Sequence, residues 1–217
     1  MATLFTPDRQ LLLFAEDVLS RNKGGNIIFD VKSTRNLSPW INKLGGRPIM
    51  WKTGHSLVKA KIKETNAALA GEMSGHVFFN DKGANGKKRW YGFDDGLYAG
   101  ARLLEILSRF ANPSEVLNAL PDSVSTPEQH INMQEGEPHK LIAQLQKTAK
   151  FEGATEIITI DGLRVEYADG FGLMRASNTT PVIVLRFEAD NEAALKHIQA
   201  QFREIIWGAA PHVALPF

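Results

Sequence analysis

The sequence predicts two domains: an α/β domain with a mixed sheet and flanking helices, then a smaller α+β domain with an antiparallel four-stranded sheet and two helices. Strand-like and helix-like segments alternate in the first half, which is typical of an α/β unit. In the second half, strand-like segments are bunched together with two helices. Three prolines between 113 and 127 mark the connecting segment, and we place the domains at 1–120 and 121–217.

The first domain is predicted to begin with a helix. Thr6-Pro7 offers an N-cap followed by proline at the first helical position, and apolar residues then recur at helical spacing until Gly24-Gly25. The next segments alternate, in the order strand 26–31, helix 39–44, strand 47–52, helix 56–65, and strands 67–71 and 76–79. Residues 80–88 are expected to form a glycine-rich, charged loop at a hairpin tip.

The clearest helix of the first domain is predicted over residues 94–110. Asp94 is expected to be its N-cap, and Arg109 near its end suits the helix dipole. Four apolar residues recur on one face of this helix, namely Leu97, Ala101, Leu104 and Leu107.

The second domain is predicted to contain a helix over 137–150 and a final amphipathic helix over 191–207. Between these helices the sequence predicts four strands, at 156–160, 163–167, 172–175 and 181–189. Asp161-Gly162 separates the first two of these strands and is a strong hairpin signal.

Composition and charge exclude several classes of function. Twenty-five Lys and Arg residues face 24 Asp and Glu residues, so the net charge of +1 argues against a nucleic acid or an acidic membrane held by bulk charge. The chain has no cysteine, which excludes disulfides, zinc fingers and thiol catalysis. No apolar run could span a bilayer and no signal-peptide pattern is present, so we expect a cytoplasmic protein.

The run RASNTTP at 175–181 is a candidate site for an oxyanion. Arg175 could bind an anion with two charge-assisted hydrogen bonds, and Ser177, Asn178 and Thr179 would supply neutral donors. A polar hairpin turn is the alternative, and local composition alone favours it, because Ser, Asn and Thr are common in turns.

The run GEMSGH at 71–76 is a candidate site for sugar hydroxyls. If this run is extended, Glu72, Ser74 and His76 project to one side, since side chains two residues apart share a face. The alternative is a connection between two strands with an exposed polar face.

Two further segments end predicted strands with residues that could meet an anion. Thr53-Gly54-His55-Ser56 begins a helix, where free N–H groups favour anions, and Asp30-Val31-Lys32-Ser33-Thr34 places a lysine at a strand end. Each could equally be ordinary capping or a solvated face. No Walker-type loop, GxGxxG, HExxH or GxSxG motif occurs.

Several motifs in the same order resemble the bacterial phosphomannomutase/phosphoglucomutase family of α-D-phosphohexomutases. The motifs are DVKSTRNL, GGRPIMWKTGHS, GEMSGHVFF, RWYGFDDGLY, ARLLEIL and RASNTTPVIVLRFEA. The resemblance covers nearly the whole chain, and it is to the third and fourth of the family's four domains. In that family a phosphoserine donates its phosphoryl group to a hexose monophosphate, the bisphosphate intermediate reorients, and its other phosphate returns to the serine.

The resemblance implies a role for each matching residue. Glu72 and Ser74 would bind sugar hydroxyls, and Lys32 and His55 would contact the sugar in its two orientations. His76 would lie near the reacting end and assist proton transfer. A group in the last domain would clamp the phosphate that is not transferred, namely Arg175, Ser177, Asn178 and Thr179.

The sequence departs from the family pattern because it contains neither a TASHN-type serine loop nor a DGDGDR-type metal loop. We therefore interpret the chain as the substrate-binding half, a truncated form, of a phosphohexomutase. It would hold no metal itself, although Mg²⁺ is expected for the full-length family enzyme. The expected ligands are mannose or glucose 1- or 6-phosphate and hexose 1,6-bisphosphate, bound by a monomer. The alternatives are a non-catalytic sugar-phosphate binding module, or one half of a split enzyme that pairs with a separate N-terminal half.

Overall fold

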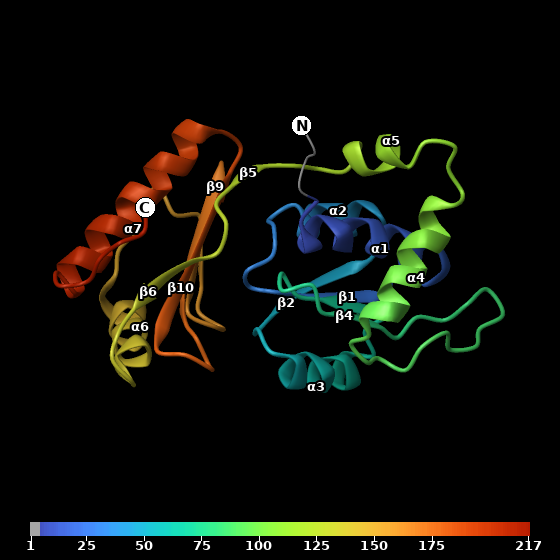
Figure 1. Ribbon diagram of the computed structural model, residues 1–217, viewed down its shortest axis with the longest axis horizontal. Coiled ribbons are helices and arrows are strands. Elements are labelled where there is room, and N and C mark those ends of the chain that lie inside the picture. Colours follow the sequence, from blue (N-terminus) through green and yellow to red (C-terminus); the bar gives the residue numbers. More distant parts are fainter. Residues whose placement is uncertain (1–4) are drawn as a thin grey trace. The chain divides into compact units, whose positions relative to one another are not determined.

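The computed structural model describes residues 5–217, and the chain forms two compact units (Figure 1). The first unit ends at Asp122 and the second begins at Ser123. Residues 1–4, which open the first predicted domain, lie outside the described residues. No helix within residues 5–217 combines the length and the apolar character that crossing a membrane requires.

The first unit contains a four-stranded mixed sheet, as the sequence predicts. Its strands are β1 (Asn26–Asp30), β2 (Arg47–Trp51), β3 (Leu69–Gly71) and β4 (Val77–Phe79), in the order β2-β1-β3-β4. Strand β1 runs parallel to β2 and β3, because helical crossovers separate these strands along the chain. Strand β4 runs antiparallel to β3, because only a short turn joins them.

Helices cover both faces of this sheet. They are α1 (Pro7–Arg21), α2 (Leu37–Lys43), α3 (His55–Thr65), α4 (Gly96–Leu107) and α5 (Pro113–Asn118). Ile27 and Phe29 of β1 pack in the cluster that includes α1 and α2, whereas Ile28 packs against α3 on the opposite face. Figure 1 shows α3 on one side of the sheet and α1 and α2 on the other.

Helix α4 differs from its prediction in its cap and in its orientation. Asp95, rather than Asp94, is the N-cap, and its carboxylate accepts a hydrogen bond from the Tyr98 backbone N–H at 3.0 Å. Leu97 and Leu104 on the predicted apolar face are 89% and 70% exposed, and the residues that α4 buries are Arg102 and Ile106.

The physical reason for this orientation is an ionic network beneath α4. The Arg102 guanidinium is 2.6 Å from the Asp17 carboxylate and 3.2 Å from the Asp81 carboxylate, and all three side chains are at most 3% exposed. The same guanidinium lies 4.6 Å from the centre of the Phe79 ring. A buried charge must be paired, so these partners hold Arg102 inward and direct the leucines to solvent.

The second unit contains an antiparallel sheet of six strands rather than the four predicted. Its order is β5-β10-β9-β8-β7, with β6 also paired to β10. The predicted strands correspond to β7 (Glu156–Ile158), β8 (Leu163–Tyr167), β9 (Gly170–Ala176) and β10 (Val182–Ala189). The additional strands are β5 (Val124–Ser125) and β6 (Gln129–Asn132), and β5 lies inside the predicted connecting segment, as does α5.

Two helices pack on one face of this second sheet. Helix α6 (Glu137–Thr148) and helix α7 (Glu192–Ala209) contribute apolar side chains to a cluster with β8, β9 and β10. The Phe202 ring of α7 lies 5.2 Å from the Phe187 ring, measured between centroids. The predicted hairpin at Asp161-Gly162 is confirmed, since β7 and β8 are antiparallel and Gly162 has φ +88°.

Candidate functional site

The carboxyl edge of the first sheet collects three of the sequence-predicted motifs. Because β1 is parallel to both β2 and β3, these three strands end at the same edge. The segments that follow them carry Lys32, His55 as the first residue of α3, and the pair Glu72 and Ser74. Ligands of open α/β sheets bind outside the carboxyl ends of the strands, so this edge is the candidate sugar site.

The run 71–76 is a turn between β3 and β4, so it forms the connection between two strands that the sequence offered as the alternative to an extended run. The Glu72 backbone N–H donates to the His76 carbonyl at 2.9 Å, and the Gly75 N–H donates to the Glu72 carbonyl at 2.9 Å. Gly75 has φ +92°, a conformation that glycine adopts at little cost. The chain must reverse here to pair β3 with β4, so Glu72 is buried whereas Ser74 and His76 are exposed.

Glu72 reaches across to the neighbouring loop. One of its carboxylate oxygens accepts a hydrogen bond from the Gly54 backbone N–H at 2.6 Å, directly before His55 at the start of α3. Burial raises the pKa of Glu72, and the negative charge of Asp30 adds to this effect. The Gly54 hydrogen bond and the positive charges of His76 and Lys32 act in the opposite direction.

Ser74 and His76 remain together in the turn. The Ser74 hydroxyl and His76 Nδ1 are 2.7 Å apart, and His76 Nε2 lies 4.0 Å from the Asp94 carboxylate. These side chains line a cavity of about 280 Å³ between the turn and the start of α4. A hydroxyl, an imidazole and a carboxylate therefore meet one small volume at the surface of the first unit.

Asp30 is the residue at this edge that sequence reasoning missed. It is fully buried, and its carboxylate accepts hydrogen bonds from Ser33 Oγ at 2.6 Å, Met73 N at 3.2 Å and Thr53 Oγ1 at 3.2 Å. The sequence shows only an aspartate near the end of a buried strand. Ser33 is close to it along the chain, but its other two partners, Thr53 and Met73, are 23 and 43 residues away.

Arg175, in the second unit, forms an ion pair with Asp161 that the sequence did not predict. It is buried near the end of β9, and its Nε is 3.1 Å from the carboxylate of Asp161 in the β7–β8 turn. Its Nη2 is also buried and has no hydrogen-bond partner among the described residues. The Asp161 carboxylate therefore orients the guanidinium through Nε, while the Nη2 amino group has no partner among the described residues.

The segment after Arg175 is a polar turn between β9 and β10. Ser177 Oγ accepts hydrogen bonds from the backbone N–H groups of Thr179 and Thr180, both at 3.3 Å. Asn178 and Thr179 are exposed. The local hydrogen bonds are therefore those of a turn. The exposed side chains of Asn178 and Thr179 follow Arg175 in the sequence by three and four residues.

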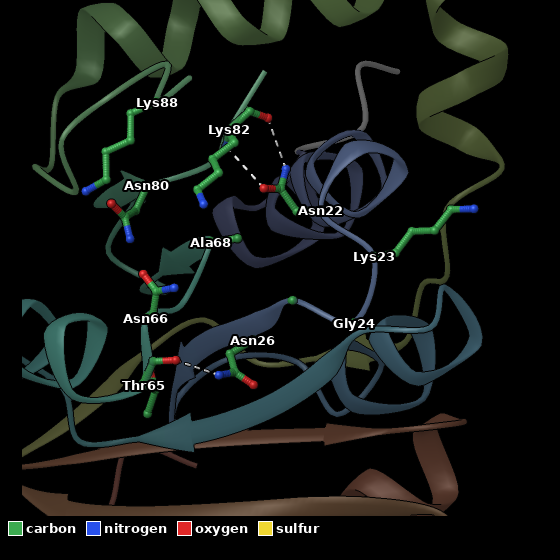
Figure 2. A pocket seen from close by; sticks show the side chains of 11 residues that line it. Asn22, Lys23, Gly24, Asn26, Thr65, Asn66, Ala68, Asn80, Lys82 and Lys88 are labelled. Carbon is green, nitrogen blue, oxygen red and sulfur yellow. Dashed lines mark hydrogen bonds between the residues drawn. The ribbon is translucent and has the colours of Figure 1, made fainter. Parts of the chain in front are cut away.

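A second hollow of the first unit lies at the amino ends of β1 and β3, at the edge of the sheet opposite to the one that carries Glu72 (Figure 2). The Asn26 side chain donates to the Thr65 carbonyl at 2.7 Å. Figure 2 shows this bond, and also the bonds that join the Asn22 side chain to the backbone of Lys82. Asn22 and Asn66 cap the C-terminal ends of α1 and α3. Helix C-termini carry partial negative charge, which favours positive side chains nearby. This accounts for Lys23, Lys82 and Lys88 around the hollow without a bound ligand.

No group of three or more His, Asp or Glu side chains within residues 5–217 is arranged to hold a metal ion.

The site residues that the family resemblance implies are divided between the two units. Lys32, His55, Glu72, Ser74 and His76 belong to the first unit, and the four residues of the 175–179 run belong to the second.

Comparison with protein families gives two matches along this chain. Residues 6–124 match "Phosphoglucomutase/phosphomannomutase, alpha/beta/alpha domain III", and residues 131–205 match "Phosphoglucomutase/phosphomannomutase, C-terminal domain". A phosphoglucomutase of Neisseria gonorrhoeae is 64% identical over 97% of the chain, which covers 44% of that relative. A phosphomannomutase/phosphoglucomutase of Pseudomonas aeruginosa is 55% identical over 99% of the chain and 45% of the relative.

Solved structures agree with these matches. A phosphoglucomutase/phosphomannomutase family protein from Burkholderia thailandensis superimposes with a TM-score of 0.90 at 63% identity, over all of this chain and 44% of that protein. N-acetylphosphoglucosamine mutase from Aspergillus fumigatus shares the fold at 13% identity, with a TM-score of 0.65 over 95% of this chain and 44% of that protein. The chain thus spans less than half the length of the relatives it matches.

Proposed function

Because the chain belongs to the phosphoglucomutase/phosphomannomutase family, we propose that it is the substrate-binding part of an enzyme that interconverts hexose 1-phosphates and 6-phosphates. Its relatives are named phosphoglucomutase and phosphomannomutase/phosphoglucomutase, so the proposed substrates are glucose and mannose phosphates. The observation that carries the proposal is the convergence of three loops at the carboxyl edge of β1, β2 and β3.

In this proposal the first unit recognises the sugar. The Glu72 carboxyl and the Ser74 hydroxyl bind sugar hydroxyls, while Lys32 and His55 contact the sugar in either orientation. His76, held by Ser74 at 2.7 Å, moves a proton at the reacting end. Buried polar groups that lose their partners when a hydroxyl is missing discriminate strongly between ligands, so the buried Glu72 is suited to this task.

The second unit binds the phosphate that is not transferred. Arg175 supplies the positive charge while Asp161 holds its Nε, and Ser177 with the exposed Asn178 and Thr179 adds neutral donors. Hydrogen bonds from a guanidinium to phosphate are roughly twice as strong as neutral ones, so Arg175 should dominate.

A charge-conserving substitution tests the phosphate site. Arg175→Lys keeps the positive charge but loses the planar fork, so the affinity for inorganic phosphate and for glucose 1-phosphate should fall about 5- to 30-fold. The measurement is an NMR titration of both proteins, followed at residues 175–180. Arg203→Lys, the same change on α7, is the matched control and should leave the affinity unchanged. Absent shifts at 175–180, or equal shifts in wild type and Arg175→Lys, would show that the segment is only a turn.

Catalysis is expected to require parts that this sequence does not contain. Its residues include no TASHN-type serine loop and no DGDGDR-type metal loop. The Mg²⁺ expected for the family has no ligand cluster among residues 5–217, so the proposal assigns this chain binding and orientation rather than phosphoryl transfer. The bisphosphorylated intermediate would form only when those loops are supplied by another segment.

The 217-residue chain alone should therefore show no mutase turnover. The assay offers glucose 1-phosphate with Mg²⁺ and glucose 1,6-bisphosphate, and it measures glucose 6-phosphate with a coupled dehydrogenase. A preparation from cells without the expression plasmid sets the background. Turnover above that background would demand a nucleophile within this chain and would contradict the proposal.

A further inference from the structure

Asp30 occupies the centre of the carboxyl edge. It is the last residue of β1, the strand between β2 and β3. Three loops leave this edge, and we name them the first edge loop (31–36), the second edge loop (52–54) and the third edge loop (72–76). Asp30 is fully buried, so its carboxylate is not placed to meet a ligand in solvent.

The Asp30 side chain makes one hydrogen bond to each edge loop. It accepts from Ser33 Oγ of the first loop at 2.6 Å, from Thr53 Oγ1 of the second at 3.2 Å and from the Met73 backbone N–H of the third at 3.2 Å. An ionised carboxylate only accepts, and its two oxygens offer about four lone-pair sites, so one aspartate can serve three donors. The Ser33 N–H also donates to the Asp30 carbonyl at 3.0 Å.

Each of these bonds is made beside a residue of the proposed sugar site. Ser33 follows Lys32, Thr53 lies two residues before His55, and Met73 stands between Glu72 and Ser74 in the chain. The bond from Gly54 N–H to Glu72 adds a direct link between the second and third loops. A shift of about 1 Å in such groups can cost about 100-fold in rate, so their common anchor matters.

We propose that Asp30 is the positioning residue that holds the three edge loops, and with them the sugar-binding side chains, in one arrangement. It acts through Ser33, Thr53 and Met73 and does not touch the substrate. The identity of the ligand in this inference rests on the proposed function, whereas the coupling of the loops does not.

Hydrogen exchange measures the coupling directly. In Asp30→Ala the backbone amides of Ser33, Gly54 and Met73 should all exchange at least about 10-fold faster than in the wild type, because all three loops lose one acceptor together. Thr53→Val removes the Thr53 hydroxyl, and with it the side-chain bond from the second loop to Asp30, so exchange should rise at Gly54 and stay within about twofold at Met73 and Ser33. Ile106→Ala, a core truncation on α4, is the control for general destabilisation.

Ligand binding gives the second readout. The dissociation constant for glucose 1-phosphate, followed by NMR at the edge loops, should rise at least about 10-fold in Asp30→Ala and be unchanged in Ile106→Ala. Asp30→Asn keeps one acceptor oxygen and should fall between the wild type and Asp30→Ala in both readouts. If Asp30→Ala does not fold, Asp30→Asn and Thr53→Val decide by the same criteria.

The outcomes separate the two ideas. Faster exchange at all three loops without any glucose 1-phosphate binding in the wild type would keep the positioning role and contradict the proposed function. Exchange that rises uniformly across the first unit, as in Ile106→Ala, or only at Ser33, would overturn the positioning role. Unchanged exchange in Asp30→Asn and Asp30→Ala would overturn it as well.

Discussion

Replacing Arg102 with methionine is expected to lower the free energy of unfolding of the first unit by about 3 kcal/mol, because it removes the more deeply buried of the two cations that contact both Asp17 and Asp81. Arg21 is the other cation and still contacts both carboxylates, so the loss stays near the low end for a broken buried ion pair. Asp17 and Asp81 are 3% and 0% exposed, and Arg102 contacts both. Urea unfolding followed by tryptophan fluorescence measures this effect, since three of the four tryptophans lie in the first unit.

Arg109→Met is the matched control for this prediction. Arg109 is 2.9 Å from the same Asp17 carboxylate, but its side chain is 47% exposed. Solvent screens an exposed pair, so this substitution should cost no more than about 1 kcal/mol. Equal losses in the two variants would show that burial of the network does not determine its contribution.

The same network predicts acid sensitivity. Burial alone would raise the pKa of Asp17, but hydrogen bonds from Arg21 and Arg102 and the charge of Arg21 hold this pKa well below its usual range. A carboxyl with a depressed folded-state pKa stabilises the protein above its unfolded pKa of about 3.9 and loses that contribution as the pH falls. The urea concentration at the unfolding midpoint should therefore decrease as the pH is lowered below about 4, and this decrease should be less steep in Asp17→Asn.

Replacing Gly162 with alanine should destabilise the second unit by about 2–5 kcal/mol. Gly162 has φ +88°, and an added Cβ would lie 2.4 Å from the Met174 carbonyl oxygen and 2.6 Å from the Arg175 Cβ. Backbone strain and a clash with backbone therefore add. The change should also weaken phosphate binding, because it displaces the turn whose Asp161 orients Arg175.

Gly153→Ala separates the two causes of this loss. Gly153 has φ +73°, but an added Cβ there meets nothing within 4 Å. It should cost only about 1–2 kcal/mol of backbone strain and leave phosphate binding intact. Stability is measured by hydrogen exchange in β8 and β9 of both variants, and affinity is measured by the phosphate titration. Equal effects of the two substitutions on either quantity would contradict the assigned clash.

Elements with strong local signals could be predicted closely. The strand at 163–167 has the same bounds in the structure, and the helix begins at Pro7 after Thr6 as expected. Asp161-Gly162 forms the predicted turn. These features depend on a few neighbouring residues, through φ preferences, capping positions and periodic apolar side chains.

Short edge strands could not be predicted in the same way. Strands β5 and β6 have two and four residues and little apolar alternation, and both exist because β10 offers its backbone to pair with them. The orientation of α4 is a second example. Arg102, rather than the predicted apolar side of the helix, faces the interior, because its partner Asp17 lies there, 85 residues away in the sequence.

By itself, the sequence determined the two fold classes, most element bounds and the chemical inventory of the candidate loops, because these follow from local backbone preference and residue type. Only the tertiary structure decided that Glu72 binds Gly54, that Asp161 orients Arg175 and that Asp30 joins three loops. Each of these depends on where a buried polar group finds its partner. Burial penalises an unpaired polar group wherever it lies, so the partner is chosen by proximity in the folded chain rather than along the sequence.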